Sequence, residues 1–169
     1  MKFLYLLRHA KSSWEDAGLA DHDRPLTPRG KRAAVAIADH FRREGIQPAL
    51  VLCSTARRAR DTVKPLRRVL SDRAEVRFES ALYAASSGDL LGRLRSVAEP
   101  VPSVMLVGHN PGLQELGLRL ARPSARRDVL ERKFPTGALA ILEMDAASWR
   151  NVAKGPGELT SLILPRELG

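Results

Sequence analysis

An arginine and a histidine stand together where the first apolar segment of the chain ends. Residues 3–7 form a continuous apolar run, and Arg8 and His9 follow it directly. Such a run predicts a β-strand that is covered on both faces. Histidine is a nucleophile and proton carrier near neutral pH, and arginine presents planar N–H donors that match phosphoryl oxygens. This pair makes phosphoryl transfer the chemistry to test against the rest of the sequence.

Two further apolar segments, residues 50–53 and 104–107, also end in polar residues. The first leads into three arginines and the second into a histidine and an asparagine: Arg57, Arg58, Arg60, His109 and Asn110. In open α/β sheets, ligand sites lie beyond the carboxyl ends of the strands. Parallel strands would therefore bring two histidines and at least two arginines to one edge. At least one of the three neighbouring arginines is expected to lie on a solvated helix face instead.

A site of this composition meets the requirements of phosphoryl transfer. The transferred group carries negative charge on three equatorial oxygens, and fixed positive groups stabilise that charge. A neutral histidine can attack phosphorus and form a covalent intermediate that water then hydrolyses. We expect a backbone carbonyl to accept a hydrogen bond from one ring nitrogen of His9. That bond would fix the tautomer and leave the other nitrogen free.

The elements that must position these residues alternate along the chain. Thr27 and Pro28 are typical of a helix start, and Gly45 is typical of a helix end. A second helix is expected from a cap at Ser54 or Thr55 toward Leu70. Further helices are expected at 87–98 and 113–120, and further strands at 75–78, 138–144 and 160–164. This alternation predicts an α/β fold, a three-layer sandwich in which helices cover both faces of a central, mostly parallel sheet. One domain spanning 1–169 is expected.

Charge and composition restrict the partners. Lys and Arg number 28 against 19 Asp and Glu, a net charge of +9. This balance favours anionic partners, which include phosphorylated molecules and nucleic acid. Aromatic residues make up only 5% and do not interleave with the arginines as single-strand binders require. A basic nucleic-acid-binding module therefore stays as the non-enzymatic alternative, and it is disfavoured.

Location follows from two features of the sequence. Cys53 is the single cysteine, so no internal disulfide is possible and a reducing cytoplasm is expected. No apolar run approaches the roughly 20 residues that a membrane-spanning helix needs. We therefore expect a cytoplasmic protein with no membrane partner.

Two other phosphatase chemistries find little support. A cysteine phosphatase needs a Cys-x5-Arg loop, but Ala59 stands at that distance from Cys53. A metal site could begin at His22-Asp23 together with His9 or His109, yet the chain has no His/Asp cluster of recognised spacing. We expect neither a metal nor another cofactor, and we expect His22 and Asp23 to order a loop over the site.

Four ordered motifs resemble those of a known family. The segment 7–10 (LRHA) resembles the RHG or RHA signature of the histidine phosphatase superfamily, also called phosphoglycerate mutase-like, and the segment 21–30 (DHDRPLTPRG) resembles the stretch after it. The segment 54–62 (STARRARDT) is similar to the family's Ser-x-x-x-Arg-Ala-x-x-Thr pattern, and 107–110 (VGHN) resembles its second-histidine motif. The resemblance covers nearly the whole chain. The short length resembles the SixA-type phosphohistidine phosphatase branch.

The resemblance implies a role for each matching residue. His9 would be the nucleophile and would be phosphorylated in the intermediate. Arg8 and Arg58 would bind phosphoryl oxygens, and His109 would lie against the phosphate and stabilise the transition state. The substrate-binding set implied in this way is Arg8, Arg24, Arg58, His109 and Asn110.

The proton donor of the family has no clear counterpart here. Many members carry an acid after the third strand, where this chain has only Glu79, a few positions early. Asp21 and Asp23 are further candidates, and either of them could instead pair with Arg24. An ester gains roughly 10²–10⁴-fold from a general acid, whereas the imidazole of a phosphohistidine can already be protonated near neutral pH. A phosphohistidine in a phosphotransfer protein is therefore the expected substrate, and a small phosphate ester is the alternative.

Overall fold

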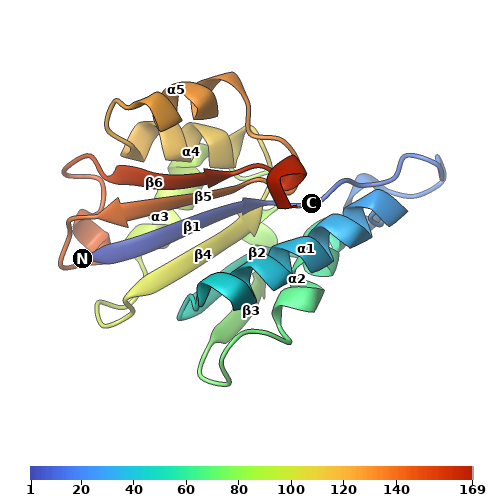
Figure 1. Cartoon of the computed structure of the whole chain (residues 1–169), viewed down its shortest axis with the longest axis horizontal. Helices are drawn as coiled ribbons and strands as arrows, with labels where there is room; N and C mark the ends of the chain where they lie inside the picture. The colour runs from blue at the N-terminus through green and yellow to red at the C-terminus, as the bar shows by residue number, and fades with distance from the viewer. Residues whose placement is uncertain (169) are drawn as a thin grey trace.

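The computed structural model describes residues 1–168 and contains a six-stranded sheet with the order β3-β2-β4-β1-β5-β6 (Figure 1). The strands are β1 (Lys2–Arg8), β2 (Leu50–Ser54), β3 (Glu75–Glu79), β4 (Ser103–Gly108), β5 (Leu139–Met144) and β6 (Glu158–Ile163). The helices are α1 (Pro28–Glu44), α2 (Arg57–Leu66), α3 (Ser87–Arg95), α4 (Gly112–Leu120) and α5 (Ala125–Arg132). Four short 3-10 turns are η1 (Asp21–Asp23), η2 (Ser80–Leu82), η3 (Trp149–Asn151) and η4 (Pro165–Leu168). Of these six strands, only β5 runs opposite to the others, so the predicted α/β fold with a mostly parallel sheet is confirmed.

Two cores cover the two faces of the sheet. On one face, Ile37 and Phe41 of α1 and Val63 of α2 pack against β1, β2 and β4. On the other face, leucines of α3 and α4 and Trp149 of η3 cover the same strands. Figure 1 shows α1 and α2 together on one side of the sheet, and α4 and α5 together on the other side. No helix within residues 1–168 is long and apolar enough to cross a bilayer.

The start of α1 is fixed by its sequence and by a close contact. The Thr27 Oγ accepts a hydrogen bond from the Gly30 N–H at 2.9 Å, and Pro28 occupies the first turn. A Cβ at Gly30 would lie 2.2 Å from the Lys11 carbonyl oxygen. Only glycine allows the helix to approach the segment after β1 so closely. At the other end, Gly45 adopts φ +66°, as expected of a helix-ending glycine.

Several predicted boundaries are wrong. The residue before α2 is Ala56, which makes no side-chain cap; the Ser54 side chain instead accepts from the Ala56 N–H and faces the segment after β4. The helices α2 and α3 end at Leu66 and Arg95, a few residues earlier than expected. The apolar spacing did not predict α5, although Ser124 caps it by accepting from the Arg127 N–H.

Strand register brings three polar segments to one edge. Arg8 pairs with Gly108 across β1 and β4, and Cys53 pairs with Val107 across β2 and β4. The residues that follow these strands are therefore neighbours in space, and the His9 N–H donates to the Gly108 carbonyl at 3.0 Å. The expected meeting of the three strand ends is confirmed.

Candidate active site

His9 lies at the carboxyl end of β1 and is only 6% exposed. Its Nδ1 lies 2.7 Å from the carbonyl oxygen of Ala10. A carbonyl only accepts, so Nδ1 carries the hydrogen and Nε2 keeps a free lone pair. Burial, followed by the positive charges of Arg58 and Arg8, lowers the pKa of His9 to about 3, and the hydrogen bond to Ala10 offsets only part of this. The ring is therefore neutral at pH 7, and the predicted backbone carbonyl partner is confirmed.

His109 follows β4 and lies beside His9. The two ring centroids are 5.2 Å apart, and the His109 Nε2 is 2.8 Å from the Ser54 Oγ. Burial and then Arg58 lower the pKa of His109 to about 4. Both imidazole rings are therefore neutral at neutral pH. Ala10 holds the ring of His9, and Ser54 of β2 holds the ring of His109.

Arg8, which is half-buried, and Arg58, which is buried, place positive charge beside His9. Arg58 is 6% exposed and comes from the first turn of α2, and Arg8 donates to the Phe134 carbonyl at 3.1 Å. The Nε atoms of both guanidinium groups are buried and make no hydrogen bond within residues 1–168. Buried donors without partners are uncommon, because each forfeits its hydration. An anion bound between the arginines would satisfy both.

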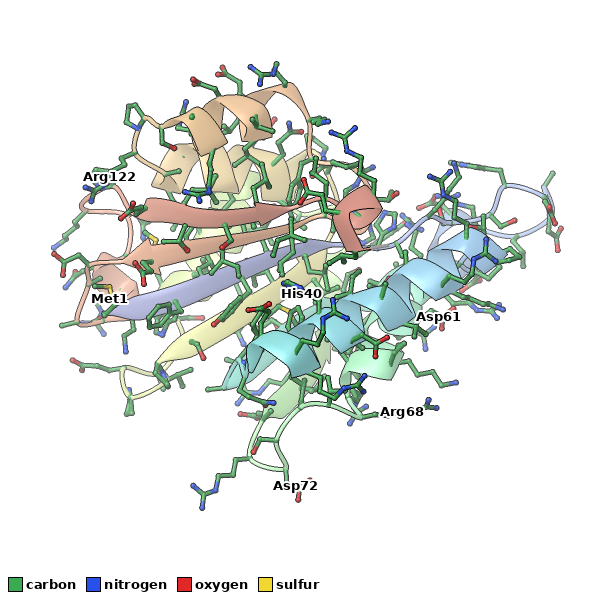
Figure 2. The ribbon with its side chains drawn as sticks, in the orientation of Figure 1. Met1, His40, Asp61, Arg68, Asp72 and Arg122 are labelled. Atoms are coloured by element: carbon green, nitrogen blue, oxygen red, sulfur yellow. The ribbon has the colours of Figure 1, made fainter. Side chains whose placement is uncertain are left out.

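The two arginines beside Arg58 point away from the site, as expected of a solvated helix face. Arg57 pairs with Asp61 at 3.6 Å on the exposed side of α2, where Figure 2 labels Asp61. Arg60 is exposed and donates to the Thr55 carbonyl. Burial thus selects Arg58 from the three.

Thr62 ties the helix of Arg58 to the segment of His9. Its Oγ donates to the Arg58 carbonyl at 2.7 Å and accepts from the Ala10 N–H at 2.9 Å. Thr62 is fully buried. Thr62, the last residue of the 54–62 motif, therefore links Arg58 to Ala10, whose carbonyl accepts from His9.

Asp21 of η1 joins three side chains at the edge of the site. Its carboxylate accepts from Arg58 at 3.1 Å, from Arg24 at 3.0 Å and from the Tyr83 hydroxyl at 2.5 Å. The Tyr83 hydrogen bond, followed by Arg58 and Arg24, lowers the pKa of Asp21 to about 2. The carboxylate is therefore ionised at neutral pH and is a poor proton donor. Tyr83, whose ring contacts His109 edge-on, was not predicted; its place in the segment after β3 was the available signal.

The other two acid candidates lie elsewhere. Both oxygens of Glu79 accept from Arg93, at 2.7 and 2.9 Å, and this pairing lowers the pKa of Glu79. Asp23 is an exposed neighbour of His22, 3.6 Å from its ring. His22 itself is 2.9 Å from the Thr55 hydroxyl and contacts the Tyr83 ring, so it orders the η1 turn beside the site. Glu79, one of the three candidate proton donors, is therefore held by Arg93.

A cavity of about 380 Å³ lies among these groups. Its lining contains all six residues predicted for the site: Arg8, His9, Arg24, Arg58, His109 and Asn110. Lys11, Ser12, Trp14 and Thr136 complete it. Asn110 donates to the Phe134 carbonyl at 2.9 Å, the same oxygen that Arg8 uses. We call this space the phosphoryl cavity.

Trp14 was not predicted. It is 76% exposed, and the Arg24 guanidinium carbon lies 3.4 Å from its ring centroid. Arg24 is buried under this stacking and bonded to Asp21, which confirms the predicted alternative of an Arg24–Asp21 pair. The isolated aromatic residue in a polar loop was the only signal for Trp14.

Cys53 and the possible metal ligands form no second centre. Cys53 is fully buried and donates to the Ser54 carbonyl, and burial raises the pKa of its thiol to about 12. At neutral pH it therefore stays a buried thiol. Within residues 1–168, no group of three or more His, Cys, Asp or Glu side chains is placed to hold a metal ion.

The model of the histidine phosphatase superfamily (branch 1) matches residues 4–115, a span that contains all six predicted residues. The chain belongs to the histidine phosphatase superfamily. An uncharacterized protein of Mycobacterium tuberculosis (strain H37Rv) is 39% identical over 95% of this chain and 100% of its own length. Two solved structures belong to SixA proteins to which phosphohistidine phosphatase activity is ascribed. The one from Nakamurella multipartitia has TM-score 0.83 and 33% identity over 97% and 96% of the two chains. The one from Agrobacterium tumefaciens has TM-score 0.82 and 31% identity over 97% and 99%.

These similarities place this histidine phosphatase in the SixA-type branch. Family membership makes the protein a phosphatase that hydrolyses phosphorylated substrates. The four motifs that carried the resemblance occupy one edge of its sheet, because each follows a strand or opens a helix there.

Proposed function

We propose that this phosphatase hydrolyses phosphohistidine in a phosphotransfer protein through a phosphorylated His9, without a metal ion. The observation that carries the proposal is the state of His9. It is neutral and buried, its Nδ1–H is held by Ala10, and its Nε2 is free beside two arginines with unpartnered Nε–H groups. This is the arrangement that a histidine nucleophile requires.

The first step transfers the phosphoryl group to the enzyme. The His9 Nε2 lone pair attacks phosphorus, the new N–P bond forms, and the N–P bond of the substrate breaks. The leaving imidazole takes its electron pair with a proton already on the ring. Arg8 and Arg58 meet the equatorial oxygens with N–H donors fixed before the reaction, and such preorganised donors are worth about 10²–10³-fold each.

His109 stabilises the same oxygens as a neutral donor. The Ser54 Oγ already accepts from the Ala56 N–H, so its own proton is available to the His109 Nε2. The hydrogen of His109 then lies on Nδ1. In the second step water attacks phosphorus, the Nε2–P bond of His9 breaks, and inorganic phosphate leaves with one proton released to solvent.

The substrate class follows from the carboxylates. Asp21 is ionised and shared by Arg58, Arg24 and Tyr83, and Glu79 is held by Arg93. An alkoxide leaving group would need a proton from such a residue, whereas an imidazole arrives protonated near neutral pH. Two SixA proteins of similar sequence and structure, to which phosphohistidine phosphatase activity is ascribed, support this choice over a small phosphate ester.

The test is phosphate release from a phosphohistidine-bearing phosphotransfer protein in excess chelator. Wild type and His40→Gln, which changes a histidine on α1 far from the cavity (Figure 2), are expected to turn over. His9→Gln is expected to lose at least about 10⁴-fold in kcat/KM, as for other covalent nucleophiles. An acid-labile phosphoenzyme should form in wild type and in His40→Gln but not in His9→Gln. Activity of His9→Gln near the wild-type level would overturn the mechanism, and turnover of small esters alone would overturn the substrate class.

A further inference from the structure

A second pocket of about 330 Å³ adjoins the phosphoryl cavity. Four cationic side chains line it, and we call it the cationic pocket: Lys11, Arg29, Lys133 and Arg166. Ala33 and Leu164 contribute apolar surface. Lys11 and Thr136 line both spaces, so the two are continuous.

The four cations come from distant parts of the chain. Lys11 follows β1, Arg29 lies in the first turn of α1, Lys133 follows α5, and Arg166 belongs to η4. Figure 1 shows η4 beside the carboxyl end of β1. Only the tertiary structure brings these charges to one edge.

These charges have no counter-charge in the part of the chain that is described. None of the four side chains makes a hydrogen bond or ion pair with residues 1–168, and the lining includes no carboxylate. Elsewhere on the surface, cations such as Arg42 and Arg57 do pair with acidic neighbours. Four unpaired like charges around one hollow repel each other and create a positive potential that attracts an anion.

The position of the pocket indicates what that anion belongs to. A phosphoryl group bound at His9 lies in the phosphoryl cavity, so the adjoining cationic pocket is placed to receive other anionic groups of the same substrate. Trp14, on the lining of the phosphoryl cavity, is largely exposed. Exposed tryptophan and arginine side chains together are typical of protein–protein contact surfaces, which favours a protein as the occupant.

We propose that the cationic pocket binds aspartate and glutamate side chains of the phosphoprotein substrate, next to the residue that carries the phosphoryl group. This inference rests on the proposed function and specifies its substrate class: phosphohistidine within an acidic surface. The pocket sets selectivity and encounter rate, because exposed charge pairs act mainly on association. Lys11 links the two sites and contacts both the phosphoryl group and the nearest carboxylate.

Binding tests the pocket without any turnover. A fluorescent peptide rich in Asp and Glu is titrated, by polarisation, into wild type and the triple variant Arg29→Ser/Lys133→Ser/Arg166→Ser. The matched control Arg68→Ser/Arg95→Ser/Arg122→Ser removes three exposed arginines that line neither space; Figure 2 labels Arg68 and Arg122. Three exposed pairs of modest strength predict a Kd roughly tenfold weaker in the pocket variant, against less than about twofold in the control.

Two binding results would overturn the proposal. Equal weakening in both variants would mean that net charge alone attracts the peptide. Tighter binding of a small bisphosphate than of the peptide, lost in the pocket variant, would mean that the pocket takes a second phosphate group and not protein carboxylates.

Kinetics separates this proposal from the proposed function. The readout is the ratio of kcat/KM for a phosphohistidine-bearing protein to kcat/KM for phosphoramidate, a probe too small to reach the cationic pocket. The pocket variant is expected to lower this ratio roughly tenfold. An unchanged ratio in an active pocket variant would overturn the proposed role of the cationic pocket. If wild type hydrolyses neither substrate, the proposed function is overturned, and peptide binding then decides the role of the pocket.

Discussion

The phosphoryl cavity and the cationic pocket share Lys11 and Thr136, but their charged side chains differ in burial and in pairing. In the cavity, Arg58 is buried, bonded to Asp21 and placed beside two histidines with lowered pKa values. In the pocket, Arg29 and Lys133 are exposed and make no bond to residues 1–168. Burial excludes water and fixes the positions of the cavity charges, so these charges interact strongly with a group bound between them. Exposed charges act weakly and over a longer range.

The largest expected difference is between two adjacent arginines. Arg58→Gln should lower kcat/KM by about 10²–10³-fold, because it removes a fixed donor to the transferred group. Arg57→Gln, one residue away on the exposed side of α2, should stay within about twofold. The comparison is measured on phosphoramidate with purified, folded variants. Similar losses in both variants would show that burial of Arg58 does not set its role.

The lowered pKa values predict acid sensitivity of the fold. His9 and His109 have folded-state pKa values of about 3 and about 4, below the roughly 6.5 of an unfolded histidine. Between pH 6.5 and 4 both histidines bind a proton in the unfolded chain but not in the folded one. The free energy of unfolding is therefore highest above pH 6.5 and falls with acidification. Each histidine contributes a slope of about 1.4 kcal/mol per pH unit.

Urea unfolding of wild type and His9→Gln at pH 7, 6 and 5 measures that slope. The variant should lose about one histidine's share of it. Asp21 has its pKa lowered to about 2, so its own loss begins only below about pH 4 and does not overlap this range. A slope unchanged in His9→Gln would contradict a buried, neutral His9.

Thr62 offers a smaller effect on the same cavity. Thr62→Val keeps the volume but leaves the Ala10 N–H without its acceptor, which should lower the free energy of unfolding by about 1–3 kcal/mol. The Thr27→Val variant, which removes the half-buried α1 cap, should lose about 1 kcal/mol. Only Thr62→Val should also lower kcat. Equal kcat in both would show that the link from α2 to His9 is not needed for activity.

Salt should give the smallest effect and should separate the two sites. Raising NaCl from about 50 to 500 mM shortens the screening length severalfold, so Kd for an acidic peptide should weaken by about threefold to tenfold. The kcat for phosphoramidate, which depends on buried charges, should change by less than about twofold. A kcat that falls as steeply as peptide affinity would remove the distinction between the cavity and the pocket.

Local sequence predicted the cavity well. Arg8 ends a strand, His9 and His109 each directly follow one, and Arg58 lies in the first turn of the helix after one, so the edge of a parallel sheet was enough to bring them together. The start and end of α1 were equally legible, because Thr27, Pro28 and Gly45 act on their own neighbours. The α2 cap was predicted wrongly because the Ser54 hydroxyl pairs with His109, which follows a different strand, β4.

The sequence by itself determined the chemistry of this protein: which residue types stand at the strand ends, and thus a phosphatase of the histidine type. Only the tertiary structure decided which arginine is buried, that Asp21 and Tyr83 hold Arg58, and that Glu79 belongs to Arg93. It also brought Lys11, Arg29, Lys133 and Arg166 to one pocket. The physical reason is that burial and pairing depend on contacts between segments far apart in the chain, which residue type and spacing do not encode.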